Sequence, residues 1–360
     1  MPHIDVTTPG GHYSVVVERG ALAGLASVLP PRHGTVFVVS TEDVWALHGA
    51  KVETALGHIA FHKLFFAGGE DNKRMAHVER MAEEMAVHGG DRSSVVIAFG
   101  GGIVGDLAGF LAAIFMRGIP VIQVPTTLLA QVDASVGGKT GTNLVSGKNL
   151  VGAFHQPVAV VIDPAVLETL SDREFRAGLY EIIKTGIIAD PELFHQLANS
   201  RDEILARRHH VLDHVIAMSV KIKAHVVSSD ERESGPRRIL NFGHTFGHAL
   251  EAETGYVRFL HGEAVSWGIR AATHLAANCG MLPAEARITI LNVLDRYGPI
   301  PTTEGLDAAA IEQRMVRDKK TIRQQVHFVL PQTIGTVVVR NDIPTAPALI
   351  AIQQALEECR

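Results

Sequence analysis

Cysteine is scarce in this sequence, and long apolar runs are missing. Two cysteines among 360 residues cannot form a disulfide framework, so we expect a reducing compartment. No apolar run reaches the roughly 18 residues that a membrane-spanning helix needs. The first residues also lack the basic and apolar segments of a secretory signal. We therefore expect a cytoplasmic protein that does not partner with a membrane.

The sequence also lacks an excess of positive charge. Its formal net charge of −5 argues against a general nucleic-acid surface. No internal repeat or low-complexity tract interrupts the chain, and 46% hydrophobic with 20% charged residues is typical of a globular protein. A single hydrophobic core stops growing at about 250–300 residues, so we expect two domains.

Short apolar runs alternate with helical patterns in the first half of the chain. This alternation predicts an α/β domain, in which helices cover both faces of a parallel sheet. The expected strands span 13–20, 35–40, 59–67, 93–102, 120–127 and 158–164, and the expected helices span 42–56, 72–88 and 104–116.

Helical spacing dominates the second half of the chain. We expect an α/β domain at 1–170, a mostly helical domain at 171–360, and a ligand-binding cleft between them. The expected helices of the second domain span 171–189, 191–198, 202–229, 240–254, 262–279, 283–297 and 307–317, and one short β pair lies within 326–340.

A glycine-rich turn follows the expected strand at 93–102. Gly100, Gly102 and Gly105 match the pattern GxGxxG, and an apolar helix comes after them. Glycines at these positions let backbone N–H groups approach a pyrophosphate at the N-terminus of that helix. The setting between a strand and a helix therefore predicts dinucleotide binding.

The acidic residue that binds the ribose in a Rossmann fold is missing from its usual place. That place lies about 20 residues after the glycines. Asp106, Glu42 or Asp43 could take its role. A second glycine turn, GGEDNK, also offers Glu70 and Lys73 to a ribose or a phosphate. We expect a nucleotide site in a variant topology.

A segment with the composition of a loop, 125–154, carries lysines among glycine, serine and threonine residues. A solvated loop is the simplest interpretation, but the apolar pieces LLAQV and NLVGAF must pack, which favours partial burial. Lysines there suit a phosphate, so we expect a phosphorylated, acidic small-molecule substrate. The polar residues of the segment are Asp133, Lys139, Lys148 and Asn149, and further cations are Arg117, Lys223, Arg237, Lys319 and Lys320.

Histidines and a glutamate form a candidate metal site. His244 and His248 lie four residues apart, so a helix would place both imidazoles on one face. With 19 histidines in the chain, such a pair also arises by chance. Glu181 could complete a three-ligand zinc site that leaves a fourth position open for a substrate oxygen. A third histidine, His261, follows further along the chain.

The residues around the histidine pair limit which kinds of site the pair could form. Thr245 occupies the position of the catalytic glutamate in an HExxH metalloprotease, so that enzyme class is excluded. Gly243 and Gly247 lie beside the pair, together with Asn241, although glycine costs a helix roughly 1 kcal/mol per residue. Such glycines indicate that something approaches the backbone closely at this point.

Taken together, the motifs resemble the 3-dehydroquinate synthase family, the sugar-phosphate cyclases of the shikimate pathway, over nearly the whole chain. Their number, length and order leave little room for chance similarity. The resemblance implies an NAD-binding α/β domain followed by a helical metal-binding domain. The matching stretches are GGGIVGDLAGF, RGIPVIQVPTTLLAQVDASVGGKTGTN, GKNLVGAFHQP, GLYEIIKTGII, DERESGPRRILNFGHTFGHALE, LHGEAVSWG and RDKKTIRQQVHFVLP.

The resemblance also implies roles for individual residues. It makes Glu181, His244 and His261 the ligands of zinc, or of cobalt, and His248 a proton-transfer residue. One departure is Tyr180, because a small residue is expected before the metal glutamate. The positions matched to the substrate or to catalysis are Lys139, Asp133, Asn149, Lys184, Lys223, Arg237, Asn241, Glu233 and one of Lys319 and Lys320.

Further implied contacts involve NAD and a second subunit. Arg117 is expected to reach the active site of the neighbouring subunit in a homodimer. The positions matched to NAD binding are Glu70, Lys73, Gly101, Gly102, Gly105, Asp106, Thr126, Thr127, Lys139, Lys148, Val166 and Thr169.

The implied reaction converts 3-deoxy-D-arabino-heptulosonate 7-phosphate into 3-dehydroquinate and inorganic phosphate. It combines transient oxidation by NAD, phosphate elimination, re-reduction, ring opening and an intramolecular aldol step. The alternatives are a related cyclase for another sugar phosphate, a metal-dependent polyol dehydrogenase and a non-catalytic binding module. Arg237 and Asn241 favour the heptulosonate, because Arg237 could bind its carboxylate in a bidentate manner.

Overall fold

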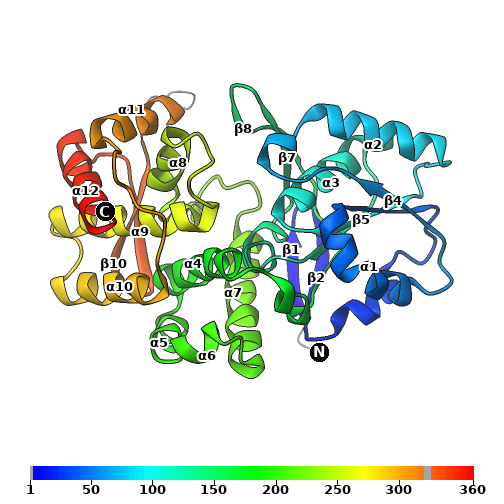
Figure 1. Cartoon of the computed structure of the whole chain (residues 1–360), viewed down its shortest axis with the longest axis horizontal. Helices are drawn as coiled ribbons and strands as arrows, with labels where there is room; N and C mark the ends of the chain where they lie inside the picture. The colour runs from blue at the N-terminus through cyan, green and yellow to red at the C-terminus, as the bar shows by residue number, and fades with distance from the viewer. Residues whose placement is uncertain (1–2, 320–325) are drawn as a thin grey trace. The chain divides into compact units, whose positions relative to one another are not determined.

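The computed structural model describes residues 3–319 and 326–360, which form two compact units (Figure 1). The first unit contains Met1–Ser171 together with Lys223–Arg232, and the second contains Asp172–Ile222 and Glu233–Arg360. Helix α7 (His209–Ser229) therefore contributes its last turns to the first unit. The sequence patterns did not indicate this return of the chain, and the domain ranges 1–170 and 171–360 stay a prediction.

The first unit is built on a sheet that has seven strands within the described residues, in the order β1-β2-β9-β6-β5-β3-β4. All six expected strands are present, and they run parallel to one another. An additional strand, β1, pairs antiparallel with β2 at one edge. The strands are β1 (His3–Thr8), β2 (Gly11–Val17), β3 (Val36–Ser40), β4 (Phe61–Phe65), β5 (Val95–Gly100), β6 (Val121–Pro125) and β9 (Ala159–Ile162).

Alternate side chains of the strands enter two different apolar cores. In β3, Phe37 and Val39 belong to one core, and Val36 and Val38 belong to the other. This period of two follows from the pleat of a strand. Both faces of the sheet are therefore covered, as expected for parallel strands. The covering elements are α2 (Met75–Val87) and α3 (Gly102–Ile114) on the first face, and α1 (Glu42–Leu56) and η1 (Ala21–Val28) on the second.

The segment expected to be a loop contains a β-hairpin instead. Strand β7 (Lys139–Leu144) pairs antiparallel with β8 (Gly147–Phe154). Gly141 and Gly152 face each other, and a Cβ on Gly152 would lie 2.1 Å from the carbonyl oxygen of Thr140. The glycines that suggested a loop therefore allow two backbones to approach closely.

Residues Lys223–Arg232 are tied to the N-terminal strands of the first unit. The carboxylate of Glu231 accepts hydrogen bonds from the Thr8 hydroxyl at 3.1 Å and from the backbone N–H of Gly10 at 3.1 Å. It also accepts one from the side-chain amide of Gln156 at 2.8 Å. Two stretches of the unit that are far apart in the sequence thus converge on one carboxylate, which lies in a third.

The second unit is helical, and α9 (His261–Asn278) lies at its centre (Figure 1). Residues 262–276 are all buried, because α4, α8, α10 and α12 pack around this helix. The expected helix at 202–229 is broken near Arg207, which has a φ of 54°. The last helix was not expected. The remaining elements are α4 (Asp172–Ala189), α5 (Pro191–Asn199), α6 (Arg201–Leu205), α8 (His244–Glu253), α10 (Ala284–Tyr297), α11 (Ala308–Lys319), β10 (Phe328–Thr333), β11 (Thr336–Arg340) and α12 (Thr345–Glu358).

No helix in the described parts of the chain combines the length and the apolar character that crossing a membrane requires.

Candidate functional site

The residues expected to bind a nucleotide follow the carboxyl ends of parallel strands. Strand β3 lies between β4 and β5, so the chain crosses from one side of β3 to the other. Open α/β sheets bind nucleotides in the crevice that such a switch point creates. The GGEDNK turn follows β4, the GxGxxG turn ends β5, and Thr126 and Thr127 follow β6. The strand order therefore gathers these expected positions at one edge of the sheet.

The glycines of the GxGxxG turn are required for space. A Cβ on Gly100 would lie 2.4 Å from Cγ2 of Val104, and one on Gly105 would lie 2.7 Å from Oε1 of Gln123. Gly101 is the N-cap of α3, and no side chain of the described residues caps that end. The first N–H groups of α3 are thus available to an anion. The turn fits a dinucleotide phosphate.

A buried lysine connects the two glycine turns. Lys73 is 3% exposed, and its Nζ donates to Oδ2 of Asp106 and to Oδ1 of Asn149, each at 2.5 Å. Burial raises the pKa of Asp106, although the nearby Lys73 ammonium opposes that rise. The network thus joins Lys73 and Asp106, which were matched to NAD binding, with Asn149, which was matched to the substrate.

Asn143, which was not among the expected site residues, connects the hairpin β7–β8 to the GGEDNK turn through hydrogen bonds. The Nδ2 of Asn143 donates to Oε1 of Glu70 at 2.7 Å, and its backbone N–H donates to the Lys73 carbonyl at 2.7 Å. The backbone N–H of Asn149 donates to Oδ1 of Asn143 at 2.8 Å. Lys148 lies 3.7 Å from Glu70. Because the segment was expected to be a loop, where asparagine is common, no local pattern in the sequence distinguished Asn143.

Other expected positions of the first unit have defined partners as well. Lys223, 7% exposed, forms an ion pair with the side chain of Asp133 and donates to its carbonyl at 2.5 Å. The hydroxyl of Thr169 lies 2.8 Å from Nε2 of His48, whose pKa is lowered by burial. Lys139, the first residue of β7, is exposed. His48 carries no motif, so sequence patterns gave no reason to choose it.

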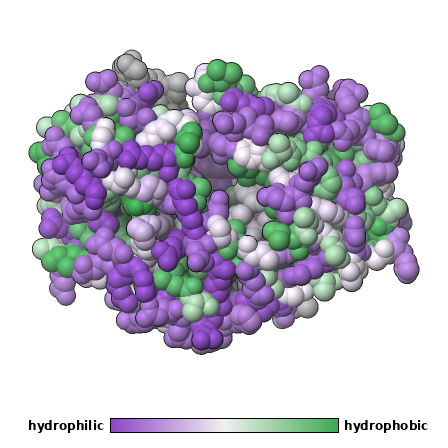
Figure 2. All heavy atoms as spheres, in the orientation of Figure 1, coloured by the Kyte–Doolittle hydropathy of each residue, from purple (hydrophilic) through white to green (hydrophobic). Residues whose placement is uncertain are grey.

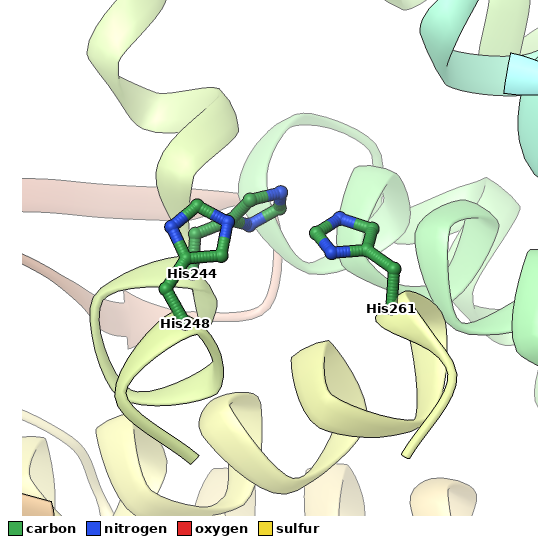
Figure 3. A group of neighbouring side chains, drawn as sticks. All are labelled: His244, His248 and His261. Carbon is green, nitrogen blue, oxygen red and sulfur yellow. The ribbon is translucent and has the colours of Figure 1, made fainter. Parts of the chain in front are cut away.

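The candidate metal ligands come together in the second unit. His244 and His248 project from the start of α8, and their rings converge with that of His261 at the start of α9 (Figure 3). Their ligand atoms all lie within 4.8 Å of one another. The Oε1 of Glu181 in α4 lies 3.7 Å from Nε2 of His244 and 3.8 Å from Nε2 of His261.

The donor set fits a divalent cation. Glu181 is 1% exposed, and within the described part of the chain neither carboxylate oxygen accepts a hydrogen bond, although Lys184 forms an ion pair with it. A buried carboxylate is costly unless cations or donors surround it. One carboxylate and two imidazole nitrogens aimed at the same point match the ligands that zinc prefers. His248 is exposed and also within reach, so the geometry alone admits it as a further ligand.

Glycines bring the three helices close enough to share this point. A Cβ on Gly262 would lie 1.9 Å from the carbonyl oxygen of Ala177 in α4. A Cβ on Gly247 would lie 2.8 Å from the carbonyl oxygen of Ala264, and one on Gly268 would lie 1.9 Å from that of Gly243. The close approach expected at Gly243 and Gly247 is therefore confirmed, and the approaching group is the backbone of α9.

Glu263 holds the start of α9 in place. Its carboxylate accepts from Arg173 Nε at 2.7 Å and from Arg173 Nη2 at 2.8 Å. It also accepts from the backbone N–H of Leu260 at 2.8 Å, which caps the helix. His261 thus projects from a first turn whose backbone is fixed by a buried carboxylate.

Other expected positions lie elsewhere in the second unit. Asn241 donates a hydrogen bond to Glu233, and Arg237 is 2% exposed. Tyr180 is buried in the apolar core, which raises its pKa, and Glu181 keeps its contacts with both histidines. Lys319 ends α11, but its side chain and the whole of Lys320 lie outside the described residues.

Comparison with known families identifies the family of this chain. A family model described as 3-dehydroquinate synthase N-terminal matches residues 63–177, and one described as 3-dehydroquinate synthase C-terminal matches residues 178–321. The chain belongs to the 3-dehydroquinate synthase family. A 3-dehydroquinate synthase from Solibacter usitatus is 58% identical over 99% of this chain and 100% of the relative. Another, from Koribacter versatilis, is 46% identical over 100% of this chain and 98% of the relative. The resemblance found in the motifs is confirmed.

Solved structures confirm the fold class. A 2-epi-5-epi-valiolone synthase from Streptomyces hygroscopicus, with NAD+ and Zn2+ bound, is 28% identical with a TM-score of 0.89, over 96% of this chain and 97% of that one. A 2-deoxy-scyllo-inosose synthase, complexed with carbaglucose-6-phosphate, NAD+ and Co2+, is 25% identical with a TM-score of 0.87, over 98% and 99%. A glycerol dehydrogenase from Schizosaccharomyces pombe, 15% identical with a TM-score of 0.64 over 98% and 92%, shares the fold alone.

Proposed function

We propose that the chain converts 3-deoxy-D-arabino-heptulosonate 7-phosphate into 3-dehydroquinate and inorganic phosphate. The observation that carries this proposal is the 58% identity with a curated 3-dehydroquinate synthase along the full length of both chains. The buried carboxylate that faces two imidazoles supports it, as does the glycine cradle at the N-terminus of α3. A cytoplasmic location remains a prediction.

Zinc or cobalt and NAD are the cofactors of this function, as in the two solved cyclases. Glu181, His244 and His261 would hold the divalent ion, which supplies a Lewis acid for substrate hydroxyls. The turns at 68–73 and 100–106 would hold NAD, which supplies reversible hydride transfer. The chain itself contributes the positions of these groups and the charges around them.

The other expected residues bind the substrate and move protons. His248 lies beside both histidine ligands and is exposed, so its imidazole can exchange a proton with a hydroxyl held at the ion. The planar guanidinium of Arg237 suits the substrate carboxylate. Lys139, Lys184 and Lys223 supply the positive charge that a phosphorylated substrate needs. These roles rest on the match of motifs.

Two rival functions share the fold. Cyclases for other substrates are represented by the solved neighbours, which are 28% and 25% identical, compared with 58% for the curated synthase. Dehydrogenases resemble the chain in fold alone. The higher identity favours the heptulosonate over either rival.

A phosphate-release assay tests the function directly. With the heptulosonate, NAD+ and zinc, we expect inorganic phosphate in a one-to-one ratio with substrate and no net absorbance change at 340 nm, because the cofactor is regenerated. Omission of NAD+ or addition of a chelator should stop the release. Accumulation of NADH with a polyol would identify a dehydrogenase, and turnover only with glucose 6-phosphate or sedoheptulose 7-phosphate would identify a different cyclase.

Replacing Lys139 with alanine is expected to lower kcat/KM about 10- to 100-fold, mainly through KM. The reason is the loss of one charge-assisted contact with the substrate phosphate, which is worth about 1.5–3 kcal/mol. Steady-state kinetics measure the effect, with Lys51→Ala, an exposed lysine of α1, as the control. Kinetics unchanged in Lys139→Ala would make that lysine merely structural.

We also propose that the chain forms a homodimer in which Arg117 reaches the site of the partner. Arg117 is exposed at a sharp turn, where it has a φ of 70° and follows Met116 with a φ of 50°. Such strained backbone is retained where it aims a side chain. In the same unit, the hairpin β7–β8 exposes the apolar side chains of Leu144, Val145, Leu150 and Phe154. Hydrophobic residues are visible at the tip of this hairpin in Figure 2.

Mixing two inactive variants tests the shared site. Arg117→Ala and Glu181→Ala should each be nearly inactive alone, but their random heterodimers contain one complete site. We expect roughly a quarter of wild-type activity after subunit exchange at equal concentrations. Light scattering gives the oligomeric state. A monomer, or no recovery of activity in proven heterodimers, would contradict the proposal.

A further inference from the structure

We infer that Glu251 is a positioning residue that fixes the ring orientation and the tautomer of His261 for metal binding. This inference rests on the proposed function, because it takes Glu181, His244 and His261 as the ligands of the divalent ion. Glu251 was not among the residues matched to any role by sequence motif.

The geometry places Glu251 behind the metal centre. It lies in the last turn of α8, seven residues after His244 and three after His248, so all three share one helix face. Its Oε2 lies 3.3 Å from Nδ1 of His261. The other nitrogen of that ring, Nε2, lies 3.8 Å from Oε1 of Glu181. The ring of His261 therefore connects two carboxylates from two different helices.

The chemistry of the contact determines the tautomer. An ionised carboxylate can only accept a hydrogen bond, so with the proposed ion on Nε2 the remaining hydrogen of His261 lies on Nδ1 and points toward Glu251. His244 follows the same arrangement, since its Nδ1 lies 3.1 Å from the carbonyl oxygen of Phe242. A carboxylate behind a liganding imidazole also raises its basicity, and loss of such a partner typically weakens metal binding about 10- to 100-fold.

The burial of Glu251 argues against a role in solubility. The residue is 3% exposed, and a buried carboxylate is retained only where partners compensate for its lost hydration. Its own backbone position is also fixed, because its carbonyl accepts from the N–H of Tyr256 at 2.8 Å. Tyr256 has a φ of 62°, and this turn closes the end of α8. The carboxylate is thus held by the helix that carries His244.

Zinc affinity provides the test, since it does not depend on turnover. Chelator competition on the full chain should give a zinc Kd about 10- to 100-fold weaker for Glu251→Gln than for wild type. The matched control is Glu253→Gln in the same helix, where the carboxylate pairs with Arg314 near the surface. The visible spectrum of bound Co2+ should also change in Glu251→Gln, because it reports the ligand geometry. A zinc Kd within twofold of wild type in folded Glu251→Gln would overturn the inference.

A measurement on the wild type covers the case in which Glu251→Gln does not fold. In zinc-loaded protein with 15N-labelled histidine, NMR should show His261 with its hydrogen on Nδ1, assigned by comparison with His261→Ala. A hydrogen on Nε2 would overturn the inference. If wild type binds no zinc at all, the proposed metal centre fails instead, so the two failures are distinguishable.

Discussion

Glu181→Ala is expected to abolish turnover, with kcat/KM reduced about 1000-fold or more. The substitution removes the one buried carboxylate of the proposed ligand set, and a Lewis acid at the substrate is worth several kcal/mol. Metal analysis by mass spectrometry should show loss of bound zinc in the same variant. His261→Ala should give the same result, since it removes a ligand without touching the ion pair between Glu181 and Lys184.

The control for this prediction is Glu192→Ala, an exposed glutamate of α5 in the same unit. It should retain wild-type activity and metal content. Thermal unfolding of each variant separates a lost ligand from a lost fold. Full activity of either ligand variant, or of the wild type in rigorously metal-free buffer, would remove zinc from the mechanism.

Gly262→Ala is expected to destabilise the second unit by about 1–3 kcal/mol and to weaken zinc binding together with it. The new Cβ would lie 1.9 Å from the carbonyl oxygen of Ala177, and backbone on both sides cannot yield without moving α9 away from α4. That movement would separate His261 from Glu181. Denaturant unfolding measures the first effect, and chelator competition measures the second.

Gly24→Ala provides the comparison, because a Cβ there meets only Oγ of Ser27, at 3.7 Å. That variant should be neutral or slightly more stable, since alanine restricts the unfolded chain. If Gly262→Ala matched it in stability and in zinc affinity, close helix contact would not be what assembles the metal centre.

The periodicity of apolar residues predicted most of the strands and helices, because it indicates which face of each element is buried. The six parallel strands and their helices followed from short apolar runs such as 35–40 and 93–102, which are confirmed. The hairpin at Lys139–Phe154 could not be seen, because its glycines and threonines have the composition of a loop. Helix α12 was missed too, and β1 pairs at an edge through contacts that local spacing does not encode.

More of the candidate site could be predicted from residue types and motifs than from the spacing of residues alone. The i, i+4 spacing placed His244 and His248 on one helix, and this is confirmed. Only the tertiary fold brings Glu181 to within 3.7 Å and 3.8 Å of two imidazoles, because that depends on glycine contacts between helices. The roles of individual residues stay predictions. Residues such as Asn143 and His48 carry no motif, so their contacts required coordinates.

The return of Lys223–Arg232 to the first unit has a consequence for biosynthesis. Glu231, which joins Thr8, Gly10 and Gln156, leaves the ribosome only after the fifty-one residues from Asp172 to Ile222. The first unit therefore cannot complete its fold during synthesis until part of the second unit has been translated. Cotranslational maturation of the two halves is then interleaved, and a stop codon placed after Ser171 would release an unfinished polypeptide.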